Sequence, residues 1–221
     1  MKNEKSLLQA LKHGSAHPAP PICIPVGRPV EALLRPVITA PGRINPVDVR
    51  YLTEWRNQFV ESFLTEFEAT EQRTSRWLSD IVHHDEGKIL FMVDDVFGNP
   101  FGYMGLAFVN WSEKYGEADS VVRGKQARSG LMMLALQSLL DWAKGYLNLS
   151  SFGVRVRSDN TALEFYRKVG FIEFLRVPLC RKEEDGMIRY VEDQAHKSAT
   201  VSLVHMAYNP SKTRGKGENH Y

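Results

Sequence analysis

A basic loop between a short apolar strand and a long apolar helix is the first candidate for chemistry in this sequence. The strand ends at Val121 and Val122, and the loop over residues 123–130 contains Lys125 and Arg128. Backbone N–H groups at a helix N-terminus, with the positive end of the helix dipole, bind phosphate oxygens. The pattern therefore predicts a pyrophosphate site for a nucleotide-like cofactor. The alternative is an ordinary connection that carries solvated cations.

The second candidate is a short helix expected over residues 161–169, directly after Asn160. Thr161 and Glu164 fit a capping box at its start, and Gly170 fits the left-handed position that ends a helix. A helix that is capped at both ends holds its side chains in fixed directions, about 100° apart for successive residues. This segment can therefore direct one side chain into a cleft and its neighbour into the core.

In this order, the two segments resemble the acetyl-CoA-binding core of the GNAT superfamily of N-acetyltransferases. In that superfamily an Asn precedes a short helix that ends in (F/Y)-Y-x-K-x-G-F, and residues 165–171 read Phe-Tyr-Arg-Lys-Val-Gly-Phe. The resemblance is firm over residues 89–174 and looser over 37–208. It implies an α/β (α+β) fold: a mixed, mostly antiparallel sheet with a central pair of parallel, splayed strands, flanked by helices.

The resemblance also implies where acyl-CoA binds and which group assists its thiol. The pantetheine is expected to pair with the strand end, and the pyrophosphate with the amides at the start of the long helix. Tyr166 is expected to point at the thioester sulfur and to protonate, or hydrogen-bond to, the leaving thiolate. The expected cofactor-binding residues are Val121, Val122, Arg123, Lys125, Arg128, Ser129, Gly130, Leu131 and Asn160.

The loop departs from the superfamily pattern Q/R-x-x-G-x-G/A. With Gln126 at the first position, Ser129 and Leu131 stand where glycines are expected, and Gly130 falls between them. Small residues still permit close approach of the backbone, but the departure leaves the cofactor geometry open. The dipeptide Arg123-Gly124 resembles members that acylate amino sugars on nucleotides, or the N-termini of ribosomal proteins.

The remaining candidates concern the acceptor amine. A carboxylate that accepts the ammonium proton is usually needed; Glu117, at the start of the strand, and Glu113, in the preceding turn, are the two candidates. Both can also be read as solvated surface carboxylates. The expected acceptor-binding residues are Arg56, Asn57, Trp111 and Glu113. For Arg56 and Asn57 a capping or surface role is the alternative, and Trp111 can instead plug a loop.

Composition narrows the class of protein. The formal net charge is only +2, and the sequence has no concentrated stripe of basic residues. A nucleic-acid partner is therefore not expected. The two cysteines, Cys23 and Cys180, lack metal-type spacing, so no metal or disulfide framework is expected. No apolar run reaches the ~18 residues that span a bilayer. We therefore expect a cytoplasmic protein without a membrane partner, and a homodimer is left open.

The pattern along the chain predicts one main domain with additions at both ends. Residues 1–31 are expected to form a short helix and a proline-rich linker outside the core, which a truncated protein could lose and still fold. The main domain spans 32–209, and a polar tail spans 210–221. Periodicity predicts helices over 47–63, after Thr70, and over 130–147 and 161–169, with strands over 88–96, 101–110, 118–123 and 152–156 and from Phe171 and Val201.

We expect an acyl-CoA-dependent N-acetyltransferase that acts on the primary amine of a small molecule, with acetyl-CoA as the simplest donor. The favoured acceptor is an amino sugar carried on a nucleotide. Two other functions stay open. One is acetylation of protein N-termini or lysines, and the other is a non-catalytic module that binds CoA or a partner protein.

Overall fold

The chain folds into two units. Unit 1 comprises Met1–Gln58 and Ala69–Ser150, and unit 2 comprises Phe59–Glu68 and Ser151–Tyr221. The computed structural model describes residues 2–14, 22–195, 199–209 and 211. Part of the predicted proline-rich linker, and all of the predicted polar tail except residue 211, lie outside the described residues.

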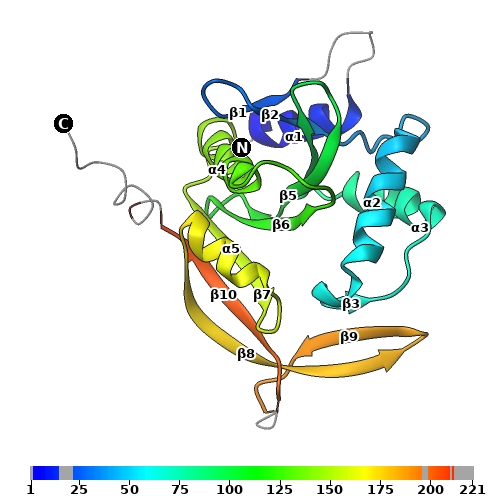
Figure 1. The fold of residues 1–221 in the computed structure, drawn as a ribbon, viewed down its shortest axis with the longest axis vertical. Coiled ribbons are helices and arrows are strands. Elements are labelled where there is room, and N and C mark those ends of the chain that lie inside the picture. The colour runs from blue at the N-terminus through cyan, green and yellow to red at the C-terminus, as the bar shows by residue number, and fades with distance from the viewer. Residues whose placement is uncertain (1, 15–21, 196–198, 210, 212–221) are drawn as a thin grey trace. The chain divides into compact units, whose positions relative to one another are not determined.

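The described residues of unit 1 form five antiparallel strands in the order β1-β2-β4-β5-β6 (Figure 1). Its strands are β1 (Ile24–Val26), β2 (Ala32–Pro36), β4 (Ile89–Asp95), β5 (Pro100–Asn110) and β6 (Tyr115–Arg123). Its helices are α1 (Lys2–His13), α2 (Pro46–Gln58), α3 (Glu71–Arg76), the π-helix η2 (Trp77–Val82) and α4 (Leu131–Tyr146). The strand order places β4 in the middle of this set, where every residue of Ile89–Val93 is buried.

Helices cover both faces of the unit 1 strands, and two neighbouring residues of β5 show this. A Cβ built at Gly102 would lie 3.1 Å from the sulfur of Met132 in α4. The ring of the next residue, Tyr103, lies parallel to that of Trp55 in α2. Successive residues of a strand point to opposite faces. Therefore α4 packs on one face and α2 on the other, which explains why β4 is buried on both sides.

The helix expected over 47–63 ends earlier than its apolar periodicity suggested. Asn45 caps its start, because its Oδ1 accepts a hydrogen bond from the Val47 N–H (2.9 Å). At the other end, the amide of Asn57 donates to Ala69 O and accepts from Ala69 N. α2 therefore stops at Gln58, and a separate 3-10 turn, η1 (Val60–Ser62), follows in unit 2.

The N-terminal segment forms the expected helix, but α1 contributes to the core of unit 1. Leu8 and Leu11 are buried, and the ammonium of Lys12 donates to the carbonyls of Val82, His83 and Asp85 at 2.7–3.0 Å. The strand β1, within the segment expected to be a linker, pairs with β2. The burial shows that the segment is not loosely attached. The domain boundary proposed at residue 32 stays untested.

Within the described part of unit 2, five antiparallel strands follow the order β7-β10-β8-β9-β3, and α5 lies across them (Figure 1). Its elements are η1, β3 (Thr65–Glu66), β7 (Ser151–Arg157), α5 (Ala162–Val169), β8 (Phe171–Glu184), β9 (Met187–Glu192) and β10 (Ser202–Tyr208). The predicted short helix and the strands on either side of it are confirmed. Gly170 ends the helix with φ of 117°, as its position in the sequence predicts.

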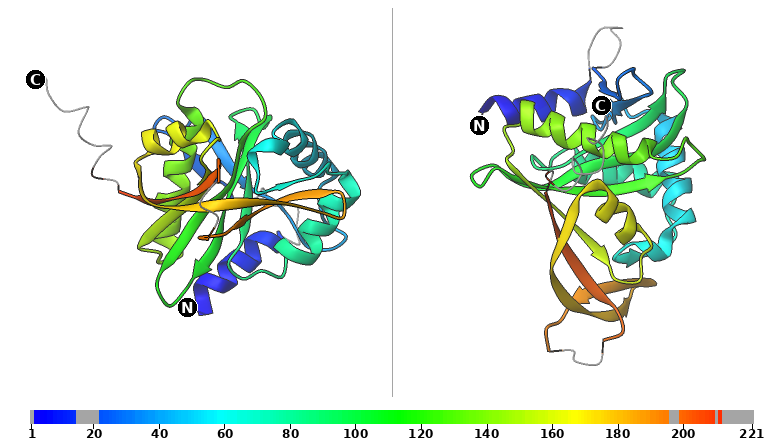
Figure 2. Two further views of the ribbon diagram at one scale, coloured as in Figure 1. Left: turned by 90° about the horizontal axis from the view of Figure 1, so that it is seen from below. Right: turned by 60° about the vertical axis from the view of Figure 1, so that its left-hand side comes forward.

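The long hairpin of β8 and β9 was not predicted (Figure 2). Its turn is Asp185-Gly186, where both residues have positive φ (53° and 70°). An Asp-Gly pair is the usual sequence of a two-residue hairpin turn of this kind. The sequence therefore contains the signal for this turn. The strands on either side of it are polar and lack the apolar alternation by which a strand is recognised. The expected mixed fold, with a mostly antiparallel sheet and flanking helices, is confirmed.

Candidate active site

The end of β6 contains a β-bulge just before the predicted cofactor-binding residues. Gly105 pairs with Asp119 and Tyr103 with Val122, so one residue of β5 lies opposite two of β6. The extra residue is accommodated by Ser120, which has φ of 53°. A bulge interrupts the regular ladder and changes the direction of the strand. The bulge at Ser120 and Val121 thus interrupts the pairing directly before Val122, where pantetheine is expected.

The basic loop, defined as residues 124–130, follows this strand. Its start is fixed, since the N–H groups of Gly124 and Lys125 both donate to Phe101 O at 2.9 Å. The next five amides, those of residues 126–130, have no acceptor among the described residues. Gly130 is the N-cap of α4 and has φ of 83°. The loop therefore presents a row of N–H groups at a helix N-terminus, as the sequence predicts for an anion site.

One member of the predicted amide row is already used within the protein. The N–H of Leu131 donates to Arg128 O at 3.1 Å, and the Leu131 side chain is buried. The unpartnered row therefore lies one residue earlier than expected, on the exposed residues Ser129 and Gly130 and the residues before them. Arg123, at the end of β6, is exposed.

The two loop cations expected to contact phosphate are both held by other side chains. Lys125 donates from Nζ to the hydroxyl of Tyr51 (3.1 Å) and lies 4.3 Å from the centre of its ring. Arg128 forms an ion pair with Glu31 at 2.5 Å. The side chains of Lys125 and Arg128 are otherwise exposed to solvent. These two contacts therefore determine where each side chain lies in this structure. Neither contact was visible in the sequence, because Tyr51 and Glu31 are distant from the loop along the chain.

The candidate proton acceptors differ in their surroundings. Glu117 is largely buried in β6 and accepts a hydrogen bond from the Tyr115 hydroxyl at 3.1 Å. Glu113 is exposed in the preceding turn, where its N–H donates to the Asn110 side chain at 3.2 Å. Trp111 is half-buried in the same turn. Of the two carboxylates, Glu117 is the more enclosed by the protein, because Glu113 is exposed to water.

The structure adds a third carboxylate, Asp119, which sequence reasoning missed. Its Oδ2 accepts from the Lys88 ammonium at 2.6 Å and from the Ser120 hydroxyl at 2.8 Å. It lies at the bulge and two residues after Glu117, a spacing that marks residues on one face of a regular strand. That alternation along β6 was the available signal. The bulge that follows could not be read from it.

The predicted acceptor residues of α2 have different environments. The side-chain amide of Asn57 is occupied by the backbone of Ala69, which accounts for this residue without a substrate. Arg56 is half-buried, and burial lowers its pKa; the positive charge of Arg73 acts in the same direction. Arg56 therefore remains a candidate for binding the acceptor. For Asn57, a structural capping role explains the residue.

Burial also raises the pKa of the Tyr103 hydroxyl, and this residue was not predicted as part of the site. Its ring lies under Trp55 with centroids 6.3 Å apart and planes at 10°. Trp55 in turn stacks on Tyr51, at 4.8 Å and 21°. Three aromatic rings thus connect the middle of β5 to the surface of α2 next to the basic loop.

In unit 2, Asn160 has a structural role at the start of α5. Its Oδ1 accepts from the Ala162 N–H (2.8 Å), and its Nδ2 donates to Ser62 O (3.2 Å). The predicted capping box is wrong: Thr161 makes no side-chain cap, and Glu164 pairs with Arg167. Asn160 provides the side-chain cap instead. Its expected approach to the cofactor stays a prediction.

Tyr166 is held firmly within unit 2. Its side chain is 6% exposed and packs edge-on against Phe171, with ring centroids 5.7 Å apart, and against Phe165 at 5.2 Å. The ring therefore has one direction, as the doubly capped helix predicts. Its role as a proton donor stays a prediction.

A buried arginine that sequence reasoning missed fixes the segment before Asn160. Arg157, at the end of β7, pairs with Glu66 at 2.6 Å and with Asp159 at 2.7 Å. Its guanidinium also lies 3.8 Å from the ring centre of Tyr190 in β9. These contacts join β7, β3 and β9. Arg157 thereby supports the loop that carries Asn160 into α5.

Two further findings concern metal binding and membrane crossing. Among the described residues, no group of three or more His, Cys, Asp and Glu side chains is placed to hold a metal ion. In the same part of the chain, no helix has the combination of length and apolar character that crossing a bilayer requires.

Comparisons with known proteins agree with this arrangement. The model of the acetyltransferase (GNAT) family matches residues 52–171. No curated protein matches the sequence. Among solved structures, a Vibrio cholerae spermidine N-acetyltransferase in complex with CoA and spermine has a TM-score of 0.62 at 18% identity, and the match covers 83% of this chain and 98% of that one.

Two other structures of spermidine N-acetyltransferase from Vibrio cholerae are similar. The spermidine/spermine N-acetyltransferase SpeG in complex with manganese ions has a TM-score of 0.57 at 20% identity, covering 85% of this chain and 98% of that one. A dodecameric form in an intermediate state has a TM-score of 0.58 at 19% identity, covering 85% and 99%. At these identities the likeness shows that the folds are the same.

Proposed function

Because the chain belongs to the acetyltransferase (GNAT) family, we propose that it transfers the acetyl group of acetyl-CoA to the primary amine of a small molecule. The observation that carries the proposal is the row of unpartnered amides at residues 126–130, directly before α4. Such a row suits the pyrophosphate of CoA, because several N–H groups and the helix dipole act on the same anion. The changed motif keeps these donors, because every residue except proline carries a backbone N–H group.

The reaction needs an acceptor for the proton of the ammonium group and a donor that protonates the leaving thiolate. The amine nitrogen forms a bond to the acetyl carbonyl carbon, the carbon–sulfur bond breaks, and the thiolate leaves. In unit 1, we assign the ammonium proton to Glu117, with Asp119 as the second carboxylate of β6. In unit 2, we assign the proton that the thiolate receives to Tyr166. Direct attack by the amine requires no enzyme nucleophile.

The charges around α2 favour an acceptor that also carries a negative group. Arg56 is half-buried near Arg73, and Lys125 lies over Tyr51 at the adjoining loop. Arg50 is an additional cation on α2, with Glu54 3.9 Å away. A phosphate or carboxylate would be attracted by this field, whereas a polyamine would be repelled. We therefore keep the amino sugar carried on a nucleotide as the proposed acceptor.

Polyamines are the second candidate, since the similar structures are spermidine N-acetyltransferases. Their fold alone is shared at 18–20% identity, and fold does not determine the acceptor. Protein N-termini and lysines form a third acceptor class. A non-catalytic module remains the last alternative.

A thiol-release assay with acetyl-CoA tests the proposal. The acceptor panel contains nucleotide-linked amino sugars, free amino sugars, spermidine and a basic peptide. We expect release only with acceptors that carry a phosphate or carboxylate, and a lower rate for Arg56→Gln with those acceptors. Faster release with spermidine would overturn the acceptor class. No release with any acceptor, in a protein that binds acetyl-CoA, would favour the non-catalytic module.

A further inference from the structure

We infer that Trp55 is a positioning residue for the basic loop: its indole sets where the loop leaves β6, and hence where the amides of residues 126–130 lie. This inference rests on the proposed binding of acetyl-CoA by that loop. Trp55 belongs to α2, whereas the amides precede α4. The indole would therefore act on the cofactor through the backbone of Gly124.

The indole lies directly against the first residue of the loop. A Cβ built at Gly124 would lie 2.0 Å from Cδ2, 2.1 Å from Cε2 and 2.4 Å from Cγ of Trp55. These distances are far inside van der Waals contact, so only glycine permits the observed approach. The φ of Gly124 is not in the left-handed region. The requirement for glycine therefore comes from the indole and not from the backbone conformation.

The indole has little freedom to move away from the loop. It is 4% exposed, and Tyr103 and Tyr51 lie parallel to it at 6.3 and 4.8 Å. Tyr103 is itself buried in β5. Packed side chains of this kind shift only at a cost to their neighbours. Trp55 is therefore a fixed surface that the chain must pass as it leaves β6.

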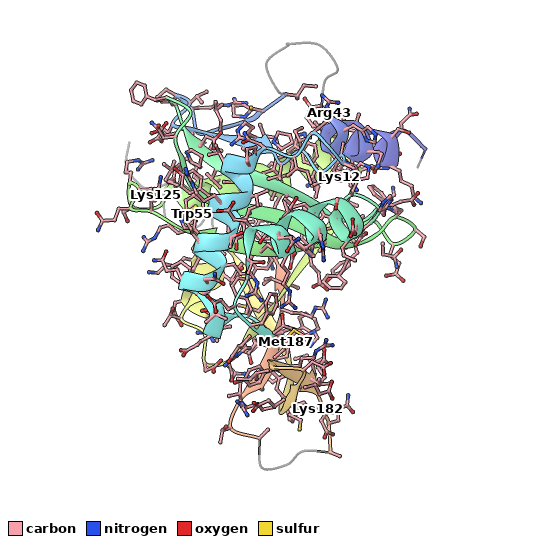
Figure 3. The ribbon with its side chains drawn as sticks, turned by 90° about the vertical axis from the view of Figure 1, so that its right-hand side faces the viewer. Lys12, Arg43, Trp55, Lys125, Lys182 and Met187 are labelled. Atoms are coloured by element: carbon pink, nitrogen blue, oxygen red, sulfur yellow. The ribbon has the colours of Figure 1, made fainter. Side chains whose placement is uncertain are left out.

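Three further contacts make the start of the loop rigid. The N–H groups of Gly124 and Lys125 share the carbonyl of Phe101, and the Lys125 ammonium is held by Tyr51. Figure 3 shows Lys125 next to Trp55 at α2. The unpartnered amides begin at the next residue. A hydrogen bond to phosphate requires about 2.7–3.2 Å between donor and acceptor. A small shift at Gly124 would therefore misplace the row of amides.

The experiment changes the contact from both sides and measures the Kd of acetyl-CoA by calorimetry together with the Tm. Gly124→Ala introduces the Cβ that the indole excludes. We expect the Kd to rise about tenfold or more, because displaced amides lose hydrogen bonds to a charged phosphate, and each such loss lowers affinity roughly tenfold or more. Gly145→Ala is the matched control, because a Cβ at Gly145 in α4 would have no neighbour within 4 Å. We expect no change in its Kd.

The double variant Gly124→Ala/Trp55→Leu separates positioning from general stability. Trp55→Leu removes the ring atoms that the new Cβ would meet, so the alanine should raise the Kd much less in this background than in the wild type. If Trp55 only supports the core, each variant lowers the Tm, but the folded protein binds acetyl-CoA with the wild-type Kd. Should Gly124→Ala fail to fold, Trp55→Phe decides: a raised Kd supports the inference, and an unchanged Kd overturns it.

The outcomes distinguish this inference from the proposed function. Absence of acetyl-CoA binding by the wild-type protein would contradict the proposed function, and the inference with it. Binding by the wild type and by Gly124→Ala with the same Kd would contradict the inference alone. In that case the indole would be part of the core, and the loop would adjust to the added methyl group.

Discussion

The two predicted parts of the site, the basic loop of unit 1 and the Asn160–Tyr166 segment of unit 2, are built in different ways. In the loop, backbone amides are exposed and unpartnered, while the side chains of Lys125 and Arg128 are held elsewhere. In unit 2, the Asn160 side chain caps a helix and Tyr166 is packed among aromatic rings. The loop thus offers its backbone, and the second segment offers side chains.

This difference explains where the sequence motif can vary. An N–H group is present on every residue except proline, so Ser129 can replace a glycine without removing a donor. A side chain proposed as a proton donor, such as the Tyr166 phenol, cannot be replaced in that way, because the proton would come from the side chain itself. We therefore expect single substitutions in unit 2 to affect turnover and those in the loop to affect binding.

The largest expected effect is on unit 1 as a whole. Removal of residues 1–31 deletes the buried Leu8 and Leu11 and the Lys12 ammonium that donates to three carbonyls. We expect the truncated protein to lose its cooperative melt, contrary to the expectation from proline content alone. Calorimetry or circular dichroism measures the melt. A truncated protein with the wild-type Tm would contradict this and restore the boundary at residue 32.

A point variant provides a milder form of the same test. Lys12→Met keeps the aliphatic stem but leaves three carbonyls without their donor, and unpaired buried groups cost about 1–3 kcal/mol each in unfavourable cases. Its Tm should lie between those of the wild type and the truncated protein.

The next effect concerns Tyr166. Tyr166→Phe keeps the ring that packs against Phe171 and removes only the hydroxyl, so folding and the Kd of acetyl-CoA should change little. Turnover should fall by ~10²-fold or more if the hydroxyl protonates the thiolate. Tyr208→Phe, in the same aromatic cluster of unit 2, is the control and should keep its turnover. A lower Tm with unchanged turnover per folded molecule would identify Tyr166 as a core residue only.

The smallest effect concerns the loop cation. Arg128→Ala should weaken acetyl-CoA binding by about 1.5–3 kcal/mol if Arg128 makes a charge-assisted contact with phosphate, with turnover at saturation nearly unchanged. Because Glu31 holds Arg128 at 2.5 Å, Glu31→Gln is the informative partner variant. Tighter binding by Glu31→Gln would mean that the carboxylate competes with phosphate. An unchanged Kd in Arg128→Ala would leave the binding to the amides alone.

Much of the framework followed from local patterns. α4 and α5, the strands β4 and β5, and the left-handed Gly170 agree with the apolar periodicity and the helix-stop residue of the sequence. These features depend on neighbouring residues along the chain, so a sequence contains them. The Asp185-Gly186 turn was equally local and could have been read. The capping box predicted at Thr161 is wrong, because the side chain of Asn160 caps the helix instead.

By itself, the sequence determined the order of strands and helices from β4 to α5, the basic loop at a helix N-terminus and the motif that ends at Phe171. Only the tertiary structure decided which groups remain available there. Tyr51 binds Lys125 and Glu31 binds Arg128. The backbone of Ala69 is hydrogen-bonded to the Asn57 side chain, and Trp55 lies against Gly124. The reason is physical: these partners are distant along the chain, and their contacts depend on how α2, β1 and β2 pack beside β6 and α4. Local periodicity carries no information on that packing.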